Sequence, residues 1–193
     1  MSPLLSIQLY TVRNLMAQRG FAAVVRDIAA IGYAGVEPAG FPGTDAVAAA
    51  TLFRELGLQS VSGHFPMPVG EQKNKVLDEA QTIGAKYVIS GKGPDDFKTL
   101  DRIKQSCAEF NEAGANASAA GLTFAIHNHW WEFQMLDGRR VYEYLLEYLQ
   151  PNVLFEVDVY WVQTGGDNPA DVVRRLGRRA PLLHIKDGPC VTG

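Results

Sequence analysis

Residues 121–132 read GLTFAIHNHWWE and combine a buried strand with a concentration of polar and aromatic side chains. The apolar run over 122–126, with a glycine before it, predicts a short buried strand. His127 and His129 follow at the C-terminal end of that strand, and side chains two residues apart on a strand point to the same side. Two of the four histidines and two of the three tryptophans lie in this stretch, so we expect chemistry at its end.

The same pattern of a strand followed by a helix continues in both directions from this stretch. Apolar strand patterns begin near residues 5, 34, 58, 86, 122, 153 and 181. Helical patterns lie between them, over 21–31, 44–56, 72–83, 99–120, 141–149 and 169–176. Thr44 is the expected N-cap of the second helix, and Pro169 lies near the first position of the last one. Seven such units predict an α/β fold with a parallel sheet, either open and doubly wound or closed as a (β/α)8 barrel.

The positions of the polar residues favour the barrel. A doubly wound sheet places its ligand groups in a glycine-rich turn after the first strand, whereas residues 10–13 here are Tyr-Thr-Val-Arg. A TIM barrel carries functional groups at the C-terminal ends of many strands. The polar residues at the ends of the expected strands are Glu37, His64, His127, His129, Asp158, His184, Lys186 and Asp187. All four histidines are among them, and we interpret them as a functional cluster at the mouth of a barrel.

The composition is that of one globular domain over residues 1–193. With 47% hydrophobic and 20% charged residues, the chain is long enough to bury a large core. A net charge of -3 gives no basic surface for nucleic acid. No stretch has the roughly 18 apolar residues of a membrane span, and no signal-peptide pattern is present. The two cysteines show no metal or disulfide spacing, so we expect a cytoplasmic protein without nucleic-acid or membrane partners. A homo-oligomer stays open.

Several of the strand-end residues form a metal-binding set without a thiolate. Asp158, His184 and one or two ligands from the fifth strand would supply imidazole and carboxylate groups, which suit Mn²⁺, Zn²⁺, Co²⁺ or Fe²⁺ better than Ca²⁺. Mg²⁺ stays open as well. Glu156 shares the inward face of its strand with Asp158, and a carboxylate buried there needs a partner such as a metal. A divalent ion would polarise a carbonyl or hydroxyl pair of a bound sugar and stabilise an enediolate.

The other candidates surround this set. Lys186 shares a face with His184 and would hold an oxyanion or a hydroxyl group; the alternative is a barrel lysine that reaches solvent. Glu132 would be a general acid or base or a further metal ligand, and an exposed loop carboxylate is the alternative. Aromatic residues at the rim suit a sugar ring, although they would also serve as core. The residues to which we assign substrate binding are Glu37, His64, Trp130, Trp131, Tyr160 and Trp161.

Three motifs resemble those of the sugar phosphate isomerase/epimerase group in the xylose isomerase-like barrel superfamily, which also contains endonuclease IV. They are AIHNHWWEF at 125–133, FEVDVYWV at 155–162 and LLHIKD at 182–187, on the fifth, sixth and seventh strands. The resemblance implies a divalent metal at the ends of strands five to eight. It matches Asp158 to the sixth-strand ligand and His184 to the seventh-strand ligand. The implied function is a metal-dependent isomerase or epimerase that moves a proton next to the carbonyl of a sugar or keto-sugar.

The sequence departs from that group at two places. His127 stands where ketose epimerases of the group carry a glutamate, so His127 would bind the metal while Glu132 or His129 moves protons. Relatives with a similar His-Asn-His segment are associated with dehydration of inososes and with elimination or hydration of 3-keto-glycosides. A lyase, dehydratase or hydratase is therefore the alternative function.

The second departure is at the end of the chain. The repeat stops after seven units, whereas a TIM barrel has eight, so we expect a barrel truncated after its seventh strand. This keeps a non-catalytic or decayed sugar-binding barrel open as a further alternative. An endonuclease is disfavoured by the acidic pI of about 5.8, because a phosphate backbone is bound by basic surfaces.

Overall fold

The computed structural model describes residues 4–192 and has an α/β fold in which helices follow short strands. The chain divides into two compact units. The first consists of Met1–Val88 with Ala120–Leu122, and the second of Ile89–Ala119 with Thr123–Gly193. The element order agrees with the expected repeat of strands and helices. One domain over 1–193 stays a prediction.

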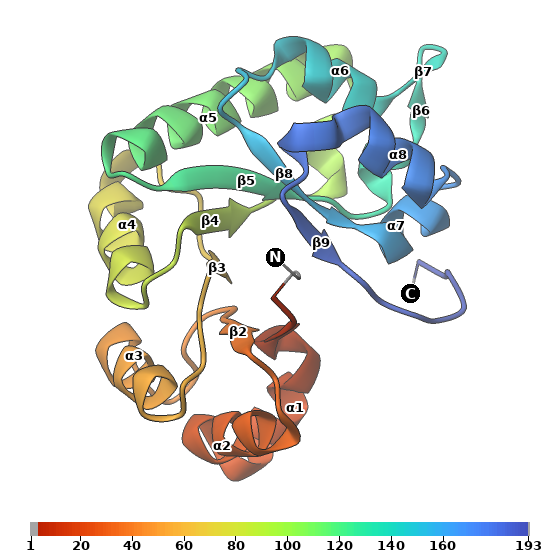
Figure 1. The fold of residues 1–193 in the computed structure, drawn as a ribbon. Helices are drawn as coiled ribbons and strands as arrows, with labels where there is room; N and C mark the ends of the chain where they lie inside the picture. The colour runs from red at the N-terminus through yellow and green to blue at the C-terminus, as the bar shows by residue number, and fades with distance from the viewer. Residues whose placement is uncertain (1–3, 193) are drawn as a thin grey trace. The chain divides into compact units, whose positions relative to one another are not determined.

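The strands of the first unit run parallel (Figure 1). β1 and β2 pair with Ser6 opposite Gly35, and isolated bridges join Gly35 to Gln59 and Ala39 to His64. Gly35 leaves no room for a side chain, because a Cβ there would lie 2.5 Å from the Gln59 carbonyl oxygen. The elements are β1 Ser6–Gln8, a 3₁₀ turn Leu9–Val12, α1 Arg13–Arg19, α2 Phe21–Ile31, β2 Gly35–Glu37, α3 Ala46–Glu55, β3 Ser62–His64, a 3₁₀ turn Gly70–Gln72 and α4 Lys73–Thr82. β4, Tyr87–Ser90, begins in this unit and ends in the second.

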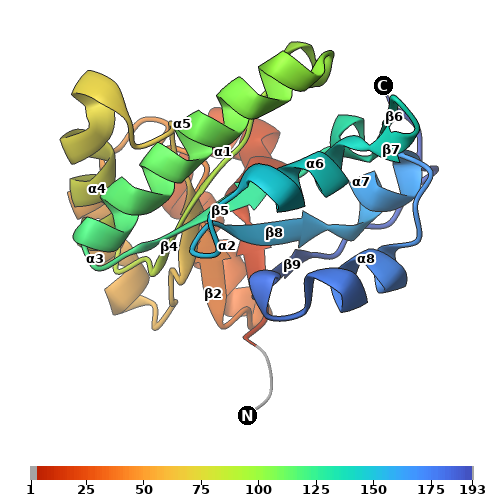
Figure 2. The same cartoon turned by 90° about the horizontal axis from the view of Figure 1, so that it is seen from above.

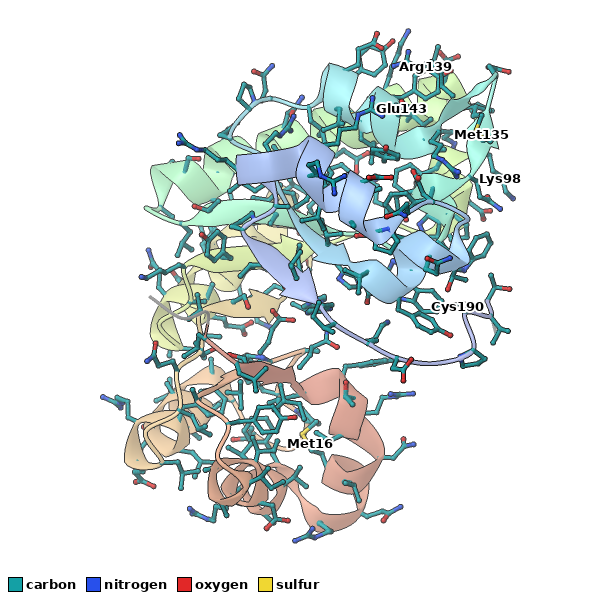
Figure 3. The ribbon with its side chains drawn as sticks, turned by 45° about the vertical axis from the view of Figure 1, so that its right-hand side comes forward. Met16, Lys98, Met135, Arg139, Glu143 and Cys190 are labelled. Atoms are coloured by element: carbon teal, nitrogen blue, oxygen red, sulfur yellow. The ribbon has the colours of Figure 1, made fainter. Side chains whose placement is uncertain are left out.

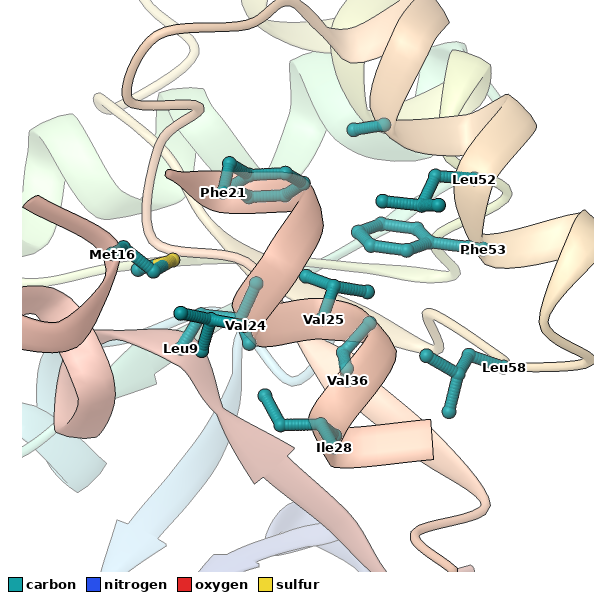
Figure 4. Packing of buried hydrophobic residues seen from close by; sticks show 11 residues of the cluster. Leu9, Met16, Phe21, Val24, Val25, Ile28, Val36, Leu52, Phe53 and Leu58 are labelled. Carbon is teal, nitrogen blue, oxygen red and sulfur yellow. The ribbon is translucent and has the colours of Figure 1, made fainter. Parts of the chain in front are cut away.

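The core of the first unit lies between α2, α3 and β2 (Figure 4). The buried residues of α2 recur at helical spacing and are Phe21, Val24, Val25 and Ile28. The rings of Phe21 and Phe53 lie with their centroids 6.1 Å apart, and Val36 of β2 and Leu58 complete the cluster. Burial of side chains of this size contributes about 2 kcal/mol each. This core holds the β1 and β2 strands in the register that aligns their C-terminal ends.

The second unit is built on three parallel strands, β5, β8 and β9 (Figure 2). β5 pairs with β8, and β8 pairs with β9. The long helix α5 packs on β5, with the Phe110 and Phe124 rings 6.0 Å apart. The elements are a 3₁₀ turn Pro94–Phe97, α5 Leu100–Ala119, β5 Thr123–His127, a 3₁₀ turn Trp131–Phe133, β6 Met135–Leu136, β7 Arg139–Arg140, α6 Val141–Tyr148, β8 Leu154–Asp158, α7 Val159–Thr164, α8 Pro169–Leu176, a 3₁₀ turn Gly177–Arg179 and β9 Leu182–His184.

Several details differ from the sequence predictions. The N-cap of α3 is Asp45, whose carboxylate accepts the Ala48 N–H at 2.8 Å, so the prediction of Thr44 as the cap is wrong. The expected Pro169 start of α8 is confirmed. The sequence patterns did not predict α1, α7 or the β6–β7 hairpin, whose exposed residues Met135 and Arg139 are labelled in Figure 3. Between residues 4 and 192, no helix has both the length and the apolar character needed to cross a membrane.

Candidate metal centre

The register of the second unit brings together side chains from three strand ends. His127 of β5 pairs with Glu156 of β8, and Asp158 of β8 pairs with His184 of β9. Residues paired across parallel strands point to the same face of the sheet, and residues two apart on one strand do so as well. The apolar residues between them, such as Ile126 and Val157, are buried in the core. Two imidazoles and two carboxylates therefore converge on one face.

Glu156 lies between the two imidazoles. Its Oε2 atom is 3.2 Å from His127 Nδ1 and 3.3 Å from His184 Nε2. The side chain of Glu156 is 1% exposed, so its charge is removed from water. A buried carboxylate is strongly unfavourable unless cations or hydrogen-bond donors surround it. The two histidines supply such partners from both sides.

Asp158 is held through its backbone and through both carboxylate oxygens. The Asn128 side chain accepts the Asp158 N–H at 2.9 Å and donates to the Asp158 carbonyl at 3.2 Å. Oδ1 of Asp158 accepts the Trp161 N–H at 3.1 Å and so caps α7. Oδ2 lies 2.8 Å from Lys186 Nζ and farther, at 3.8 and 3.9 Å, from ring nitrogens of His184 and His127. The clamp by Asn128 fixes where this carboxylate points.

Lys186 is fixed by aromatic rings as well as by Asp158. Its Nζ lies 4.4 Å from the centre of the Trp161 ring and 5.2 Å from that of Tyr160, within the range of cation–π attraction. Gly188 passes close to the same Tyr160 ring, since a Cβ there would lie 2.9 Å from it. The lysine side chain is 40% exposed, so the amine also reaches the open side of the site.

The loop after β5 places His129 above a buried carboxyl group. The His129 ring stacks on Trp131 at 4.2 Å, with 12° between the planes, and meets His127 edge-on at 5.0 Å. The backbone N–H of His129 donates to Glu132 Oε2 at 2.9 Å. Burial raises the pKa of Glu132 to about 8, against the lowering effect of backbone hydrogen bonds such as that from His129. Glu132 is therefore mostly protonated at neutral pH.

A small cavity borders Glu132. It has a volume of about 10 Å³, close to the space of one water molecule. The residues that line it are mostly apolar: Ile126, Asn128, Glu132, Phe133, Tyr142, Leu145, Phe155, Val157 and Leu176. These surroundings explain why the carboxyl group favours its neutral form.

The first unit has its own polar cluster at the ends of its strands. Glu37 of β2 lies 3.0 Å from His64 Nε2 and accepts a short hydrogen bond from the Ser62 hydroxyl. The Gln8 amide nitrogen is 3.1 Å from the same His64 nitrogen. Glu37 is buried, and its two oxygens thus have different partners, an imidazole and a hydroxyl. One carboxylate is here matched by one histidine.

The comparisons with known proteins agree with this architecture. The family described as xylose isomerase-like TIM barrels matches the sequence over residues 25–193. The chain belongs to this family. This membership confirms the resemblance inferred from the three strand motifs. None of the curated proteins gives a significant match to the sequence.

Solved structures of other proteins share the fold at low sequence identity. Two sugar phosphate isomerase/epimerases from Parabacteroides distasonis ATCC 8503 are 23% and 24% identical, with TM-scores of 0.79 and 0.81. They cover 97% and 96% of this chain, which spans 76% and 79% of theirs. A probable 3-DHS dehydratase from Bacillus anthracis is 14% identical, with a TM-score of 0.74, and covers 96% of this chain, which spans 73% of it. The predicted α/β fold of the TIM-barrel type is confirmed.

The donor atoms in this xylose isomerase-like barrel fit a divalent metal. His127, Glu156 and His184 each offer one ligand atom, and these atoms lie within 4.8 Å of one another. Two imidazole nitrogens with one carboxylate oxygen are typical of sites for Zn²⁺, Mn²⁺, Co²⁺ or Fe²⁺. Burial of Glu156 beside two histidines is the observation that supports the fit.

The structure brings most of the predicted site residues of the second unit close together, and it adds Glu156 and Asn128 to them. The grouped predictions are His127, His129, Trp131, Asp158, Trp161, His184 and Lys186. Trp130 packs on Trp131, and Tyr160 packs on Trp161. Glu132 is buried, so the alternative of an exposed loop carboxylate is wrong.

Sequence reasoning did not assign a ligand role to Glu156 or any role to Asn128. The Glu-x-Asp spacing on an apolar strand was the signal for Glu156, because it puts both carboxylates on one face. In the first unit, Ser62 and Gln8 were missed as partners of the His64 and Glu37 pair. Their neutral polar side chains gave no pattern that distinguishes them from other strand residues.

Proposed function

We propose that this chain is a divalent-metal-dependent isomerase or epimerase that acts on a sugar or keto-sugar. The observation that carries the proposal is the buried Glu156 carboxylate between His127 and His184, at 3.2 and 3.3 Å. Distant structural relatives named as sugar phosphate isomerase/epimerases support the same reaction class. The ligands would be His127, His184 and one carboxylate of β8, either Glu156 or Asp158.

A divalent ion bound there would supply Lewis-acid polarisation of neighbouring substrate oxygens, which acidifies the adjacent C–H group. The residues around it define where that C–H group would lie. Lys186 presents an ammonium on the open side, suited to an oxygen that gains negative charge. The rings of Tyr160 and Trp161 lie beside it. These two rings and that of Trp130 are partly exposed and suit the C–H face of a sugar.

We assign the proton transfer to His129. Its imidazole is partly exposed and stands next to His127, whereas the Glu132 carboxyl is 1% exposed and faces an apolar cavity. A group that transfers a proton must come within hydrogen-bond reach of the substrate. Glu132 would then be a positioning residue, which holds the His129 backbone through the 2.9 Å hydrogen bond. Substrate contacts by Glu37 and His64 stay predictions.

A second candidate function is elimination or hydration next to a keto group, by a lyase, dehydratase or hydratase. It is favoured by His127, since the fifth strand of this chain brings an imidazole where related ketose epimerases carry a carboxylate. A two-base epimerase needs proton-transfer groups on both faces of the substrate, and one imidazole suffices for elimination. The relative named as a probable dehydratase supports this alternative.

The test begins with the metal content of the purified protein, followed by incubation with keto-sugars in D₂O. Isomerisation or epimerisation would exchange a carbon-bound proton for deuterium with no loss of mass from the skeleton. Elimination would release water or an aglycone. NMR of the products separates the two outcomes. If no keto-sugar undergoes a metal-dependent reaction of either kind, the proposed enzymatic role is contradicted.

Two matched variants test the assignment of the proton transfer. We expect His129→Gln to retain the metal and to lose roughly 10²- to 10⁴-fold in exchange rate, the usual contribution of a general acid or base. Glu132→Gln should keep the hydrogen bond that its side-chain oxygen accepts and lose less activity. An equal or larger loss in Glu132→Gln, with the metal retained, would reverse the two roles.

A further inference from the structure

Arg140, at the end of β7, joins two segments that carry aromatic residues of the candidate site. Its Nη1 atom donates to the carbonyl oxygens of Phe133 and, at 3.2 Å, of Gly165. Its Nη2 atom donates to the Gly166 carbonyl at 2.7 Å, and its Nε atom lies 3.1 Å from an Asp167 carboxylate oxygen. Phe133 ends the 3₁₀ turn after β5, and Gly165 directly follows α7. One guanidinium therefore holds the loop after β5 to the end of α7.

These four acceptors suit a guanidinium better than an ammonium. A guanidinium presents its N–H groups in a fixed planar fork on three nitrogens, whereas a lysine has one nitrogen and could reach fewer of the acceptors. The side chains of Arg140 and Asp167 are 25% and 21% exposed, so their pairing is partly shielded from water. Hydrogen bonds that involve a charged group belong to the stronger class in proteins.

Gly165 shows how closely the two segments approach each other. A Cβ at this position would lie 2.6 Å from the Phe133 Cβ and 2.6 Å from the Trp130 carbonyl oxygen. The backbone at Gly165 has a φ of -75°, which suits other residues as well as glycine, so the constraint is one of space. Any larger residue there would push the segments apart.

The two joined segments carry the aromatic rings to which we assign substrate binding. Trp130 and Trp131 form one pair, with ring centroids 5.5 Å apart. Tyr160 and Trp161 form the other pair, at 4.9 Å. The His129 ring adjoins both pairs, since it stacks on Trp131 at 4.2 Å and lies 6.1 Å from Trp161. A change in the separation of the segments would therefore alter the surface that a sugar ring contacts.

We propose that Arg140 is a positioning residue for substrate binding, because it fixes the separation between the two aromatic pairs. This inference rests on the proposed function and names the residue that assembles its substrate surface. Arg140 acts through the backbone of the two segments. The candidate metal ligands lie on β5, β8 and β9, and the partners of Arg140 lie beyond the ends of these strands. Loss of the guanidinium should therefore weaken substrate binding and leave metal binding intact.

The first measurement needs no substrate and compares backbone hydrogen exchange, followed by mass spectrometry, in the wild type, Arg140→Lys and Arg139→Lys. Arg139 is the matched control on the same strand, since its guanidinium pairs with Glu147 of α6 and lies over the Tyr144 ring. We expect segments 130–134 and 159–167 to exchange about tenfold faster in Arg140→Lys alone, the factor that one hydrogen bond to a charged group supplies. Exchange of β5 and β8 should not change. Equal exchange of both segments in the wild type and Arg140→Lys would overturn the proposal.

The second measurement is the kinetics of the metal-loaded protein with a keto-sugar that it turns over. We expect Arg140→Lys to raise KM by about 10- to 100-fold, the effect of a small misplacement of binding groups, with kcat and Mn²⁺ affinity nearly unchanged. A fall in kcat at unchanged KM would overturn the proposal. Absence of turnover in the wild type would instead reject the proposed function, and hydrogen exchange would still decide whether Arg140 holds the two segments.

Gly165→Ala gives a second test that keeps the guanidinium, in case Arg140→Lys does not fold. The added methyl group should force the segments apart and raise KM in the same way, with Mn²⁺ affinity retained. Gly93→Ala is the matched control. Its φ of -80° also suits alanine, and a Cβ there would meet no atom within 4 Å among the described residues beyond its chain neighbours. An unchanged KM in Gly165→Ala would contradict the proposal.

Discussion

The two units place similar side chains at the ends of their parallel strands, but they differ in how much charge these side chains bring. In the first unit one carboxylate, Glu37, meets one imidazole and one hydroxyl, from His64 and Ser62. In the second unit two carboxylates of one strand, Glu156 and Asp158, meet two imidazoles and an ammonium. Two buried carboxylates on one face of a strand are unfavourable unless cations neutralise their charge, and this favours binding of an added cation in the second unit.

The largest expected effect separates Glu156 from Glu37. Glu156→Gln removes the charged oxygen between the two imidazoles, and we expect Mn²⁺ binding to weaken by more than about 100-fold, beyond the loss typical of residues that only orient ligands. Glu37→Gln makes the same chemical change in the other unit and should weaken Mn²⁺ binding much less. Isothermal titration calorimetry with Mn²⁺ measures the affinity of both variants. Equal weakening in the two would remove the contrast between the units.

The second prediction concerns pH and the buried Glu132. Its pKa is about 8 in the folded chain and ordinarily near 4.5, so between these values the folded state keeps a proton that the unfolded state has lost. The unfolded state then binds fewer protons, and the free energy of unfolding falls as pH rises, by about 1.4 kcal/mol per unit. The accumulated loss by pH 8 is on the order of 4 kcal/mol. Below pH 4.5 both states are protonated and this loss vanishes.

Glu132→Gln isolates this contribution because it has nearly the same shape and no titration. Urea unfolding of the wild type and the variant at pH 5, 6.5 and 8 gives the two slopes. We expect the variant to lose less stability with rising pH than the wild type. Parallel slopes would mean that Glu132 does not retain its proton in the folded state.

The third prediction tests the clamp that only the second unit has. Asn128→Asp turns a donor that bonds the Asp158 carbonyl into a carboxylate oxygen facing it, in a buried place. We expect a loss of about 3 kcal/mol in the free energy of unfolding. Asn152→Asp is the matched control, since the Asn152 side chain is exposed and donates to the Ser118 hydroxyl, and its effect should stay within about 0.5 kcal/mol.

Periodicity was sufficient to predict the helices and strands that make up the βα repeat. The strands around 123–127 and 154–158 and the helices around 100–119 and 169–176 lie close to their predicted places, because long apolar periods are dictated by burial. The helix Val159–Thr164 was missed since it begins directly at the end of β8, with Asp158 as its cap. No break in the sequence marks that change from strand to helix.

The candidate site could be predicted to the level of residue type and strand end, and no further. Alternation along a strand put His127 and His129 on one side, yet the chain leaves the sheet after His127, and His129 stacks on Trp131 instead. Which carboxylate of β8 would bind the metal, Glu156 or Asp158, depends on the other contacts of each. Asp158 pairs with Lys186 and caps α7 through the Trp161 N–H. Such pairings are set by the register between strands, which a single sequence does not specify.

The smallest expected effect tests whether the polar cluster of the first unit is held by its own hydrogen bonds. Ser62→Ala removes the hydroxyl that donates to Glu37, and a buried carboxylate oxygen that loses a donor costs about 2 kcal/mol. Ser60→Ala is the control at similar burial, because the Ser60 hydroxyl donates to the neutral carbonyl of Ser62, at 3.3 Å, and its removal should cost about 1 kcal/mol. Urea unfolding gives both values. If the two substitutions lower the free energy of unfolding equally, the Glu37 carboxylate depends on His64 rather than on Ser62 for its stabilisation. The first unit would then resemble the second more closely than its hydrogen bonds indicate.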